Sequence, residues 1–129
     1  VVRGICCLRA GVPDETENIH IISIVGRYLE HSRIYIFGQG ERARYYIGSA
    51  DWMTRSTLRR VEIAAPVTAP ALKARLQHIF DTMLADNCNA RVQQPDGSYV
   101  RRMPGADAVD CQAQFYEEAY QANVHSSLK

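Results

Sequence analysis

Residues 31–52, HSRIYIFGQGERARYYIGSADW, contain the pattern on which the fold prediction depends. Apolar and β-branched side chains are concentrated in Ile34–Phe37 and again in Arg44–Ile47, which predicts two strands. Between them lies Gly38-Gln39-Gly40-Glu41, a typical turn sequence, so the two strands are expected to pair as a hairpin. The polar residues before and after this hairpin are the first candidates for function.

The sequence on both sides predicts further strands and two helices. Turn-forming residues fill Ala10–Asn18, and Leu72, Leu76, Ile79 and Phe80 recur at helical spacing after Pro70. The expected strands are Val1–Leu8, Ile19–Val25, Arg59–Ala65, Ala90–Gln94 and Ser98–Arg102, and the expected helices are Ala71–Asn87 and Asp107–Ala122. The chain is therefore expected to be α/β, of the mixed α+β kind, with a mixed β-sheet flanked by helices.

Composition is typical of one compact domain over residues 1–129, because 47% of the residues are hydrophobic. The formal net charge of +1 argues against nucleic acid or an anionic membrane as a partner. The chain has neither a signal peptide nor an apolar run near the length of a membrane helix. Because it opens inside an expected strand and without Met, we expect a domain from a longer polypeptide.

Four cysteines are present, Cys6, Cys7, Cys88 and Cys111. They include no C-x-x-C pair, so no structural zinc site is expected, and no other metal site is predicted within the chain. The expectation is reduced, mostly buried thiols in a cytosolic protein.

His31 and its neighbours form the main candidate site. Arg33 is two residues further on, so in an extended segment both side chains share a face. Two cations there would repel unless an anion lay between them, and phosphate suits such a pair. After the hairpin, the Gly48-Ser49 turn would offer N–H groups to an anion, and Asp51 would orient the imidazole. The alternative is a strand-end histidine without a role and an ordinary turn with Asp51 as a helix N-cap.

Arginines elsewhere are further candidates. Arg3 interrupts an apolar segment, so it should have either an acidic partner such as Glu62 or a phosphate. Arg59 and Arg60 would alternate in direction along their expected strand, so that one faces solvent and the other faces the loops at the strand ends.

The remaining candidates are expected to have no role in the chemistry. Trp52, the single tryptophan, is expected to pack against the fold rather than stack on a ligand. No catalytic role is expected for His20, His78 or His125.

The same residues carry a resemblance to a known family. VRGICCLRAGVP, SIVGRYLEHSRIYIF, YIGSADWMTR and RRVEIAAPV occur in this order. The chain resembles the C-terminal catalytic domain of class-1 polyphosphate kinase over nearly its whole length, and less closely after about residue 90. That domain is similar to half of a phospholipase D fold, whose His-x-Lys and Gly-Ser-x-Asn patterns appear here as His31-Ser32-Arg33 and Gly48-Ser49-Ala50-Asp51.

The resemblance implies a reversible transfer of the ATP γ-phosphate to inorganic polyphosphate, through a phosphohistidine in an upstream domain. It implies ATP, ADP and polyphosphate as substrates, upstream domains as partners, a homo-oligomer, and Mg²⁺ held by ligands outside this chain. A cytoplasmic location is implied, with membrane association open for the full-length protein. His31 would be an assisting acid or phosphate ligand and not the phosphorylated residue. Arg3 and Arg33 would contact phosphate, Arg60 would contact polyphosphate, and Ser49 with Asp51 would orient the site.

One departure from the family pattern concerns Ser56-Thr57-Leu58, where the family usually has Asn-Leu-Asp. The missing carboxylate could position the arginine pair that follows. Two alternatives remain beside the kinase. One is a non-catalytic module that binds nucleotide or polyphosphate. The other is a phospholipase D-like phosphodiesterase, which the single His-x-Arg disfavours.

Overall fold

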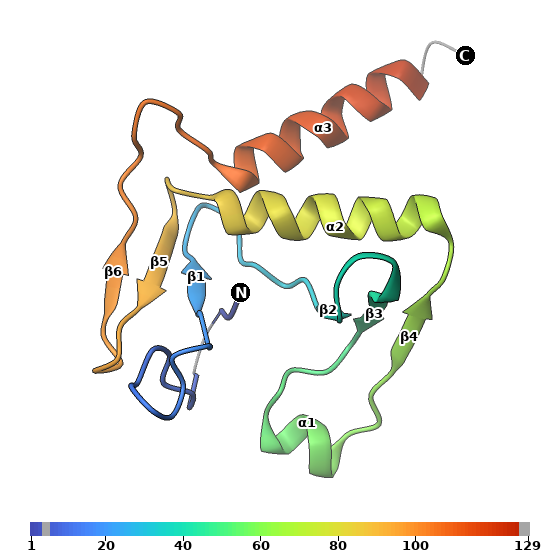
Figure 1. Ribbon diagram of the computed structural model, residues 1–129. Helices are drawn as coiled ribbons and strands as arrows, with labels where there is room; N and C mark the ends of the chain where they lie inside the picture. Colours follow the sequence, from blue (N-terminus) through green and yellow to red (C-terminus); the bar gives the residue numbers. More distant parts are fainter. Residues whose placement is uncertain (4–5, 127–129) are drawn as a thin grey trace. The chain divides into compact units, whose positions relative to one another are not determined.

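The structure is a computed structural model that describes residues 1–3 and 6–126. Its elements, in chain order, are β1 (Ile22–Ile24), β2 (Ile34–Phe37), the short 3₁₀ helix η1 (Gly40–Arg42), β3 (Arg44–Gly48), α1 (Thr54–Arg59), β4 (Ala64–Val67), α2 (Pro70–Ala85), β5 (Ala90–Gln93), β6 (Tyr99–Arg101) and α3 (Cys111–Ser126) (Figure 1). Two compact units result, one from residues 1–30 with 82–129 and the other from residues 31–81. The expected mixed α/β fold is confirmed, with the strands in two antiparallel three-stranded sheets.

The first unit is built on the sheet β1-β5-β6, in which β5 is central (Figure 1). Ile22 pairs with Val92, and Arg91 pairs with Arg101. Its apolar core includes Ile22 and Ile24, of which Ile24 is fully buried. Burial of such side chains is the main favourable term for a unit of this size.

Asp86 fixes the first unit at the end of α2. Its carboxylate is fully buried. Oδ1 accepts hydrogen bonds from Asn89 N (2.7 Å) and Ala90 N (2.9 Å), and Oδ2 accepts one from Cys111 N (3.0 Å). Burial alone would raise the pKa of Asp86, but these hydrogen bonds outweigh it and hold the pKa below its ordinary value. One carboxylate thus satisfies the starts of both β5 and α3.

Two arginines of the β6 region stabilise the C-terminal end of α2. Arg102 Nη1 donates to the carbonyls of Leu84 (2.6 Å) and Asp86 (3.1 Å), and Arg101 donates to the Cys88 carbonyl through Nη2 (2.7 Å) and Nε (3.2 Å). Helix C-termini leave carbonyls unpaired and favour cations. This arginine pair therefore has a structural role.

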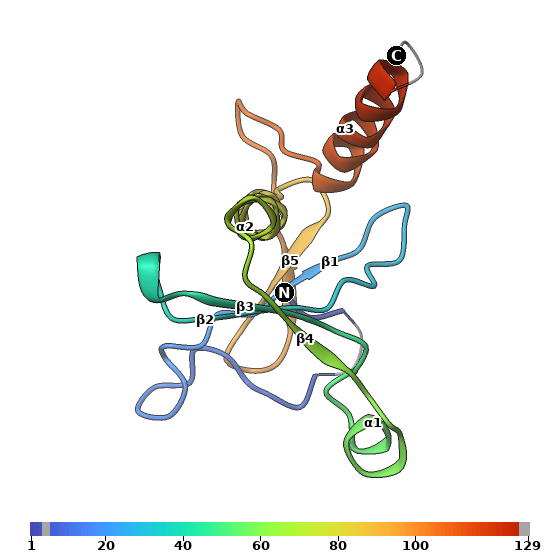
Figure 2. The ribbon, with the colours of Figure 1, turned by 90° about the vertical axis from the view of Figure 1, so that its right-hand side faces the viewer.

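The second unit is built on the sheet β2-β3-β4. Figure 2 shows α2 end-on at one side of this sheet, and Tyr45 on that face donates its hydroxyl to Gln77 Oε1 (2.7 Å). Because side chains alternate along a strand, the opposite face carries Tyr35 and Phe37 from β2 and Tyr46 from β3. One face of the sheet thus packs on α2, and the other is aromatic.

Most predicted elements are confirmed, and two are wrong. The hairpin β2/β3, the hairpin β5/β6, β1, α2 and α3 are found at or near their expected positions. The strand expected at Val1–Leu8 is absent from its described residues, where Val2 N–H donates to Ile22 O (2.8 Å) without a continuing ladder. The strand expected at Arg59–Ala65 begins only at Ala64, because Ile63 N–H donates to the Ser49 hydroxyl instead of a strand carbonyl.

Helix α1 is the element that the sequence did not predict. It has six residues, no side-chain N-cap and one buried residue, Ser56. Arg59 is its last residue and Arg60 follows it, so the two do not alternate along a strand. So short a helix has too little periodicity to be distinguished from a loop.

The four cysteines are free, but only Cys111 is fully buried, and Cys7 is exposed. The prediction of mostly buried thiols is therefore correct for Cys111 and wrong for Cys7. Burial, with Asp86 beside the thiol, raises the pKa of Cys111 far above its ordinary value, so it stays protonated. Among the described residues, no helix combines the length and apolar composition that crossing a bilayer requires.

Candidate functional site

His31 lies in the second unit, immediately before β2, and its side chain is exposed. The predicted neighbour Arg33 is in contact with it. Arg33 Nη1 is 3.0 Å from His31 Nδ1, and Nη2 is 3.3 Å from Nε2. Nη1 also donates to the His31 carbonyl (2.8 Å). Two residues in an extended segment therefore share a face, as predicted.

The two ring contacts define how the side chains meet. The lone pairs of the two imidazole nitrogens diverge within the plane of the ring. A single planar guanidinium can therefore approach both nitrogens only across the face of the ring, a packing that is common for arginine on aromatic groups. The edge of the His31 imidazole, where it donates and accepts hydrogen bonds, is thereby left open to a ligand.

Asp51 supplies the negative charge that the His31–Arg33 pair requires. Its Oδ1 accepts a hydrogen bond from Arg33 Nη2 at 2.6 Å, and the Arg33 side chain is only 15% exposed. This hydrogen bond, more than any other contact, holds the pKa of Asp51 below its ordinary value. The expectation that Asp51 would orient the imidazole directly is corrected, because its described contacts are with arginines. It also does not cap α1, whose N-cap is Met53.

Arg55 is a member of the cluster that the sequence stage did not single out as a site residue. Its Nη2 lies 3.4 Å from Asp51 Oδ2, and its side chain is 57% exposed. The signal was its position four residues after Asp51, a spacing that brings side chains together in helical turns. Two guanidinium groups now face one carboxylate, so the His31 cluster (His31, Arg33, Asp51 and Arg55) carries a net positive charge.

The Gly48-Ser49 turn does not offer the anion site that was expected of it. Gly48 N–H donates to Arg33 O and Ser49 N–H donates to Ile63 O, both at 3.0 Å. The Ser49 hydroxyl donates to Glu62 Oε2 (2.5 Å) and accepts from Ile63 N (3.0 Å). These groups join the end of β3 to the segment before β4, so Ser49 orients the chain there rather than His31.

The other two predicted phosphate residues are exposed. Arg60 follows the end of α1 in the second unit, and Arg3 belongs to the first unit. Neither side chain makes an ion pair or hydrogen bond with another described residue. The predicted acidic partner of Arg3, Glu62, accepts the Ser49 hydroxyl instead.

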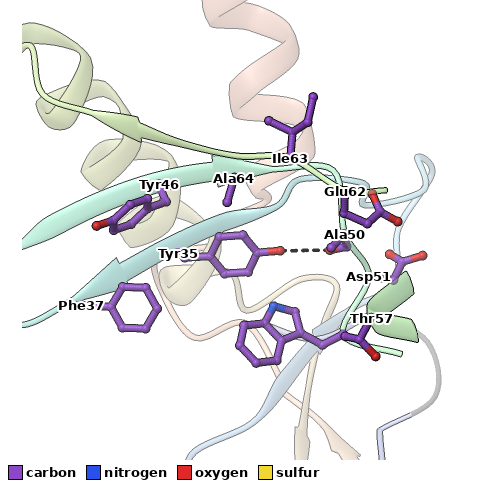
Figure 3. Close-up of a pocket in the computed structure, with 10 residues that line it drawn as sticks. Tyr35, Phe37, Tyr46, Ala50, Asp51, Thr57, Glu62, Ile63 and Ala64 are labelled. Carbon is purple, nitrogen blue, oxygen red and sulfur yellow. Dashed lines mark hydrogen bonds between the residues drawn. The ribbon is translucent and has the colours of Figure 1, made fainter. Parts of the chain in front are cut away.

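An aromatic groove of about 400 Å³ lies beside the cluster, on the sheet face opposite α2 (Figure 3). Its aromatic lining is Tyr35, Phe37, Tyr46 and Trp52, with Ile63 and Ala64 from the segment leading into β4. Trp52 meets Tyr35 with ring centroids 5.9 Å apart but is 80% exposed. The expectation that Trp52 packs inside the fold is therefore wrong.

Magnesium does not fit a site among the described residues. They contain no group of three His, Cys, Asp or Glu side chains placed to hold a metal ion. Asp51, the carboxylate nearest the cluster, has both oxygens engaged by arginines. Hard cations need several free oxygen ligands. No step is therefore derived through a metal here, and ligands outside this chain remain a prediction.

The second unit is thus a sheet-and-helix layer that presents an exposed histidine within a net cationic cluster, which defines a phosphate-handling class of domain. Comparison with known proteins makes this specific. Residues 1–114 match the family model described as polyphosphate kinase C-terminal domain 2. The chain therefore belongs to the polyphosphate kinase C-terminal domain family.

Individual relatives agree. A polyphosphate kinase from Synechocystis sp. is 56% identical over 106 residues, which cover 82% of this chain and 15% of the relative. One from Bacillus anthracis is 48% identical over 122 residues, covering 94% and 17%. The crystal structure of polyphosphate kinase from Porphyromonas gingivalis matches with a TM-score of 0.84 at 34% identity, covering 92% of this chain and 18% of that one. The chain thus spans less than one fifth of the length of these relatives.

Proposed function

We propose that this chain forms part of the active site of a polyphosphate kinase, which transfers the γ-phosphate of ATP reversibly to inorganic polyphosphate through a phosphohistidine on an upstream domain. The observation that carries the proposal is the His31 cluster, in which an exposed imidazole is braced by an arginine that is itself anchored by Asp51. Family membership supplies the reaction class, and the cluster supplies the chemistry.

The arrangement suits phosphoryl transfer. This reaction depends on positioning and on neutralising charge more than on covalent participation of each residue. Arg33 packs on the face of the His31 ring, so the ring edge remains available to donate a hydrogen bond or a proton to a phosphoryl oxygen. The net positive charge of the cluster favours the anion at that position.

The arginines divide into two roles under this proposal. Arg33 is a positioning residue, because its guanidinium is already engaged by Asp51 and His31. Arg3 and Arg60 are the phosphate ligands, since both are exposed and have no partner among the described residues. ATP, ADP and polyphosphate are then shared with upstream domains of the same polypeptide, and the complete enzyme is a homo-oligomer.

A chimeric enzyme tests the role of His31. The segment of the Synechocystis polyphosphate kinase that is similar to this chain is replaced by the matching residues of this chain, and kcat, KM for ATP and the pH–rate profile are measured. His31→Gln keeps a hydrogen-bond donor but removes the proton that can be transferred. We expect kcat to fall by about 10²-fold or more, the usual contribution of a general acid. His20→Gln is the matched control, because His20 is exposed in the other unit and should leave kcat unchanged.

The outcomes separate the two assignments for His31. Loss of the alkaline limb of the pH–rate profile in the variant identifies a general acid, whereas a raised KM with that limb intact identifies a phosphate ligand. An active chimera in which His31→Gln changes neither parameter would refute the proposal. The isolated chain should bind but not turn over ATP, and kinase activity from it alone would contradict the upstream phosphohistidine.

A further inference from the structure

The aromatic groove is not explained by the proposed phosphate chemistry. It lies on the face of the β2-β3-β4 sheet that α2 leaves uncovered, and Figure 3 shows Tyr35, Phe37 and Tyr46 projecting from that face beside Trp52. Layered α/β domains bury both faces of such a sheet, because aromatic surface in contact with water is costly. An open face of this composition is therefore incomplete.

The exposure of the lining residues is unusually high for a free surface. Trp52 is 80% exposed, Ile63 is 70% and Phe37 is 57%. Scattered apolar side chains are ordinary on a protein surface, whereas apolar side chains gathered in one concave patch mark an interaction site. Tryptophan, tyrosine and phenylalanine are also the residues that anchor stable interfaces.

The polar groups at the edge of the groove determine what kind of occupant it takes. A small-molecule site needs a few convergent polar groups that are free to bind. Here the Tyr35 hydroxyl donates to Ala50 O (2.9 Å), Asp51 accepts from Arg33, and Glu62 accepts from Ser49. The polar groups are already paired, so the groove suits an apolar protein surface rather than a polar metabolite.

We propose that this groove is covered by an apolar segment of the polyphosphate kinase chain that lies upstream of the domain described here. The match is to a C-terminal domain, and the Porphyromonas gingivalis chain has 82% of its length outside the region that corresponds to this one. The unit that carries the groove has only 51 residues, 31–81, and such small units rarely bury enough apolar surface alone. The proposal rests on family membership and not on the role of His31.

Because Asp51 contributes both to the groove and to the His31 cluster, an upstream segment seated there would lie next to the candidate site. Docking of that segment would then exclude water from one side of the cluster, which strengthens its electrostatic interactions with phosphate.

Covalent footprinting tests the occupant. The isolated chain and the Synechocystis chimera are each labelled with hydroxyl radicals, and modification of Trp52 and Phe37 is quantified by mass spectrometry. We expect Trp52 to be labelled several-fold less in the chimera than in the isolated chain. Equal labelling in both would overturn the proposal. Protection that already occurs in the isolated chain, and that rises with concentration alongside a dimer mass, would also overturn it, because a second copy would then be the occupant.

A substitution pair gives an independent test. Trp52→Glu should leave the thermal unfolding of the isolated chain nearly unchanged, since the side chain is exposed there, but should destabilise the chimera by placing a charge in a buried groove. Leu29→Glu is the matched control, because Leu29 is 69% exposed but belongs to the other unit. Equal effects of Trp52→Glu in both proteins would contradict the proposal. An inactive chimera with protected Trp52 would refute the proposed function and leave this inference standing.

Discussion

Replacing Asp86 with Asn tests whether one buried carboxylate holds the first unit together. The substitution keeps the size of the side chain but exchanges one acceptor oxygen for an NH₂ group. If the remaining oxygen keeps the N–H groups of Asn89 and Ala90, the NH₂ group faces the Cys111 N–H. Two donors then meet in a site from which water is excluded, because Asp86 is fully buried.

The cost follows from the bonds lost. A hydrogen bond to a charged group contributes about 1.5–3 kcal/mol, and a buried donor without a partner costs about 1–3 kcal/mol. We therefore expect Asp86→Asn to lower the free energy of unfolding of the first unit by about 3–5 kcal/mol, a large fraction of the stability of a small domain.

The pH dependence provides a second signature. The pKa of Asp86 is lower in the folded chain than its ordinary value of 3.8. A carboxyl of this kind stabilises the fold above its unfolded pKa, and this contribution is lost as the pH falls through the lower folded pKa. The native chain should therefore lose this stability below about pH 4, and the Asn variant should lack that part of the acid dependence.

Urea unfolding at pH 7 and pH 3, followed by circular dichroism and by hydrogen exchange of the Ala90 amide, measures both effects. Trp52, the single tryptophan, lies in the other unit, so its fluorescence monitors that unit separately. Asp107→Asn is the control, since Asp107 is exposed and should change stability by no more than about 0.5 kcal/mol. A loss below about 1 kcal/mol for Asp86→Asn, which is the size of a single neutral hydrogen bond, would refute the reasoning.

Three further substitutions have defined outcomes. Gly48→Ala would place a Cβ 2.9 Å from Tyr35 Cε2, so we expect a loss of about 1–3 kcal/mol in thermal unfolding monitored by tryptophan fluorescence; an unchanged melting temperature would contradict the close approach. Arg102→Met removes the donors to the last carbonyls of α2 and should cost about 1–2 kcal/mol in urea unfolding, whereas a neutral result would mean that water replaces them. Because the pKa of Asp51 is lowered, its pairing with Arg33 should persist at and above pH 3.8 and be lost only as the pH falls through the lowered pKa, which a carboxyl NMR titration measures; titration at the ordinary value would show that the pair does not form.

Sequence patterns predicted those parts of the fold that depend on local signals. The β2/β3 hairpin was predicted because its strands are rich in apolar and β-branched residues around a glycine turn, and α2 because its apolar residues recur at helical spacing. The segment Arg59–Ala65 was misassigned, although its alternation is real. There the Ser49 hydroxyl takes the Ile63 N–H, so regular pairing starts only at Ala64. A side-chain hydrogen bond between segments distant in sequence leaves no local signal.

The candidate site was predicted in part for the same reason. The contact between His31 and Arg33 follows from strand periodicity and is found. The contact between Arg33 and Asp51 joins residues 18 positions apart across the hairpin, so the sequence predicted that Asp51 was near but not which side chain it would bind. Side-chain choice among several neighbours depends on burial and geometry that the fold determines.

The first unit is discontinuous in sequence, and this has a consequence for synthesis. Ile22 of β1 pairs with Val92 of β5, 70 residues later, and the whole second unit lies between them. On the ribosome the second unit can therefore form while β1, with its buried isoleucines, still lacks its partner strand. Pairing at such long sequence separation is slow, since a large loop must close first. The nascent chain thus carries an unpaired apolar strand for most of its translation, which makes β1 the segment most prone to aggregation before release.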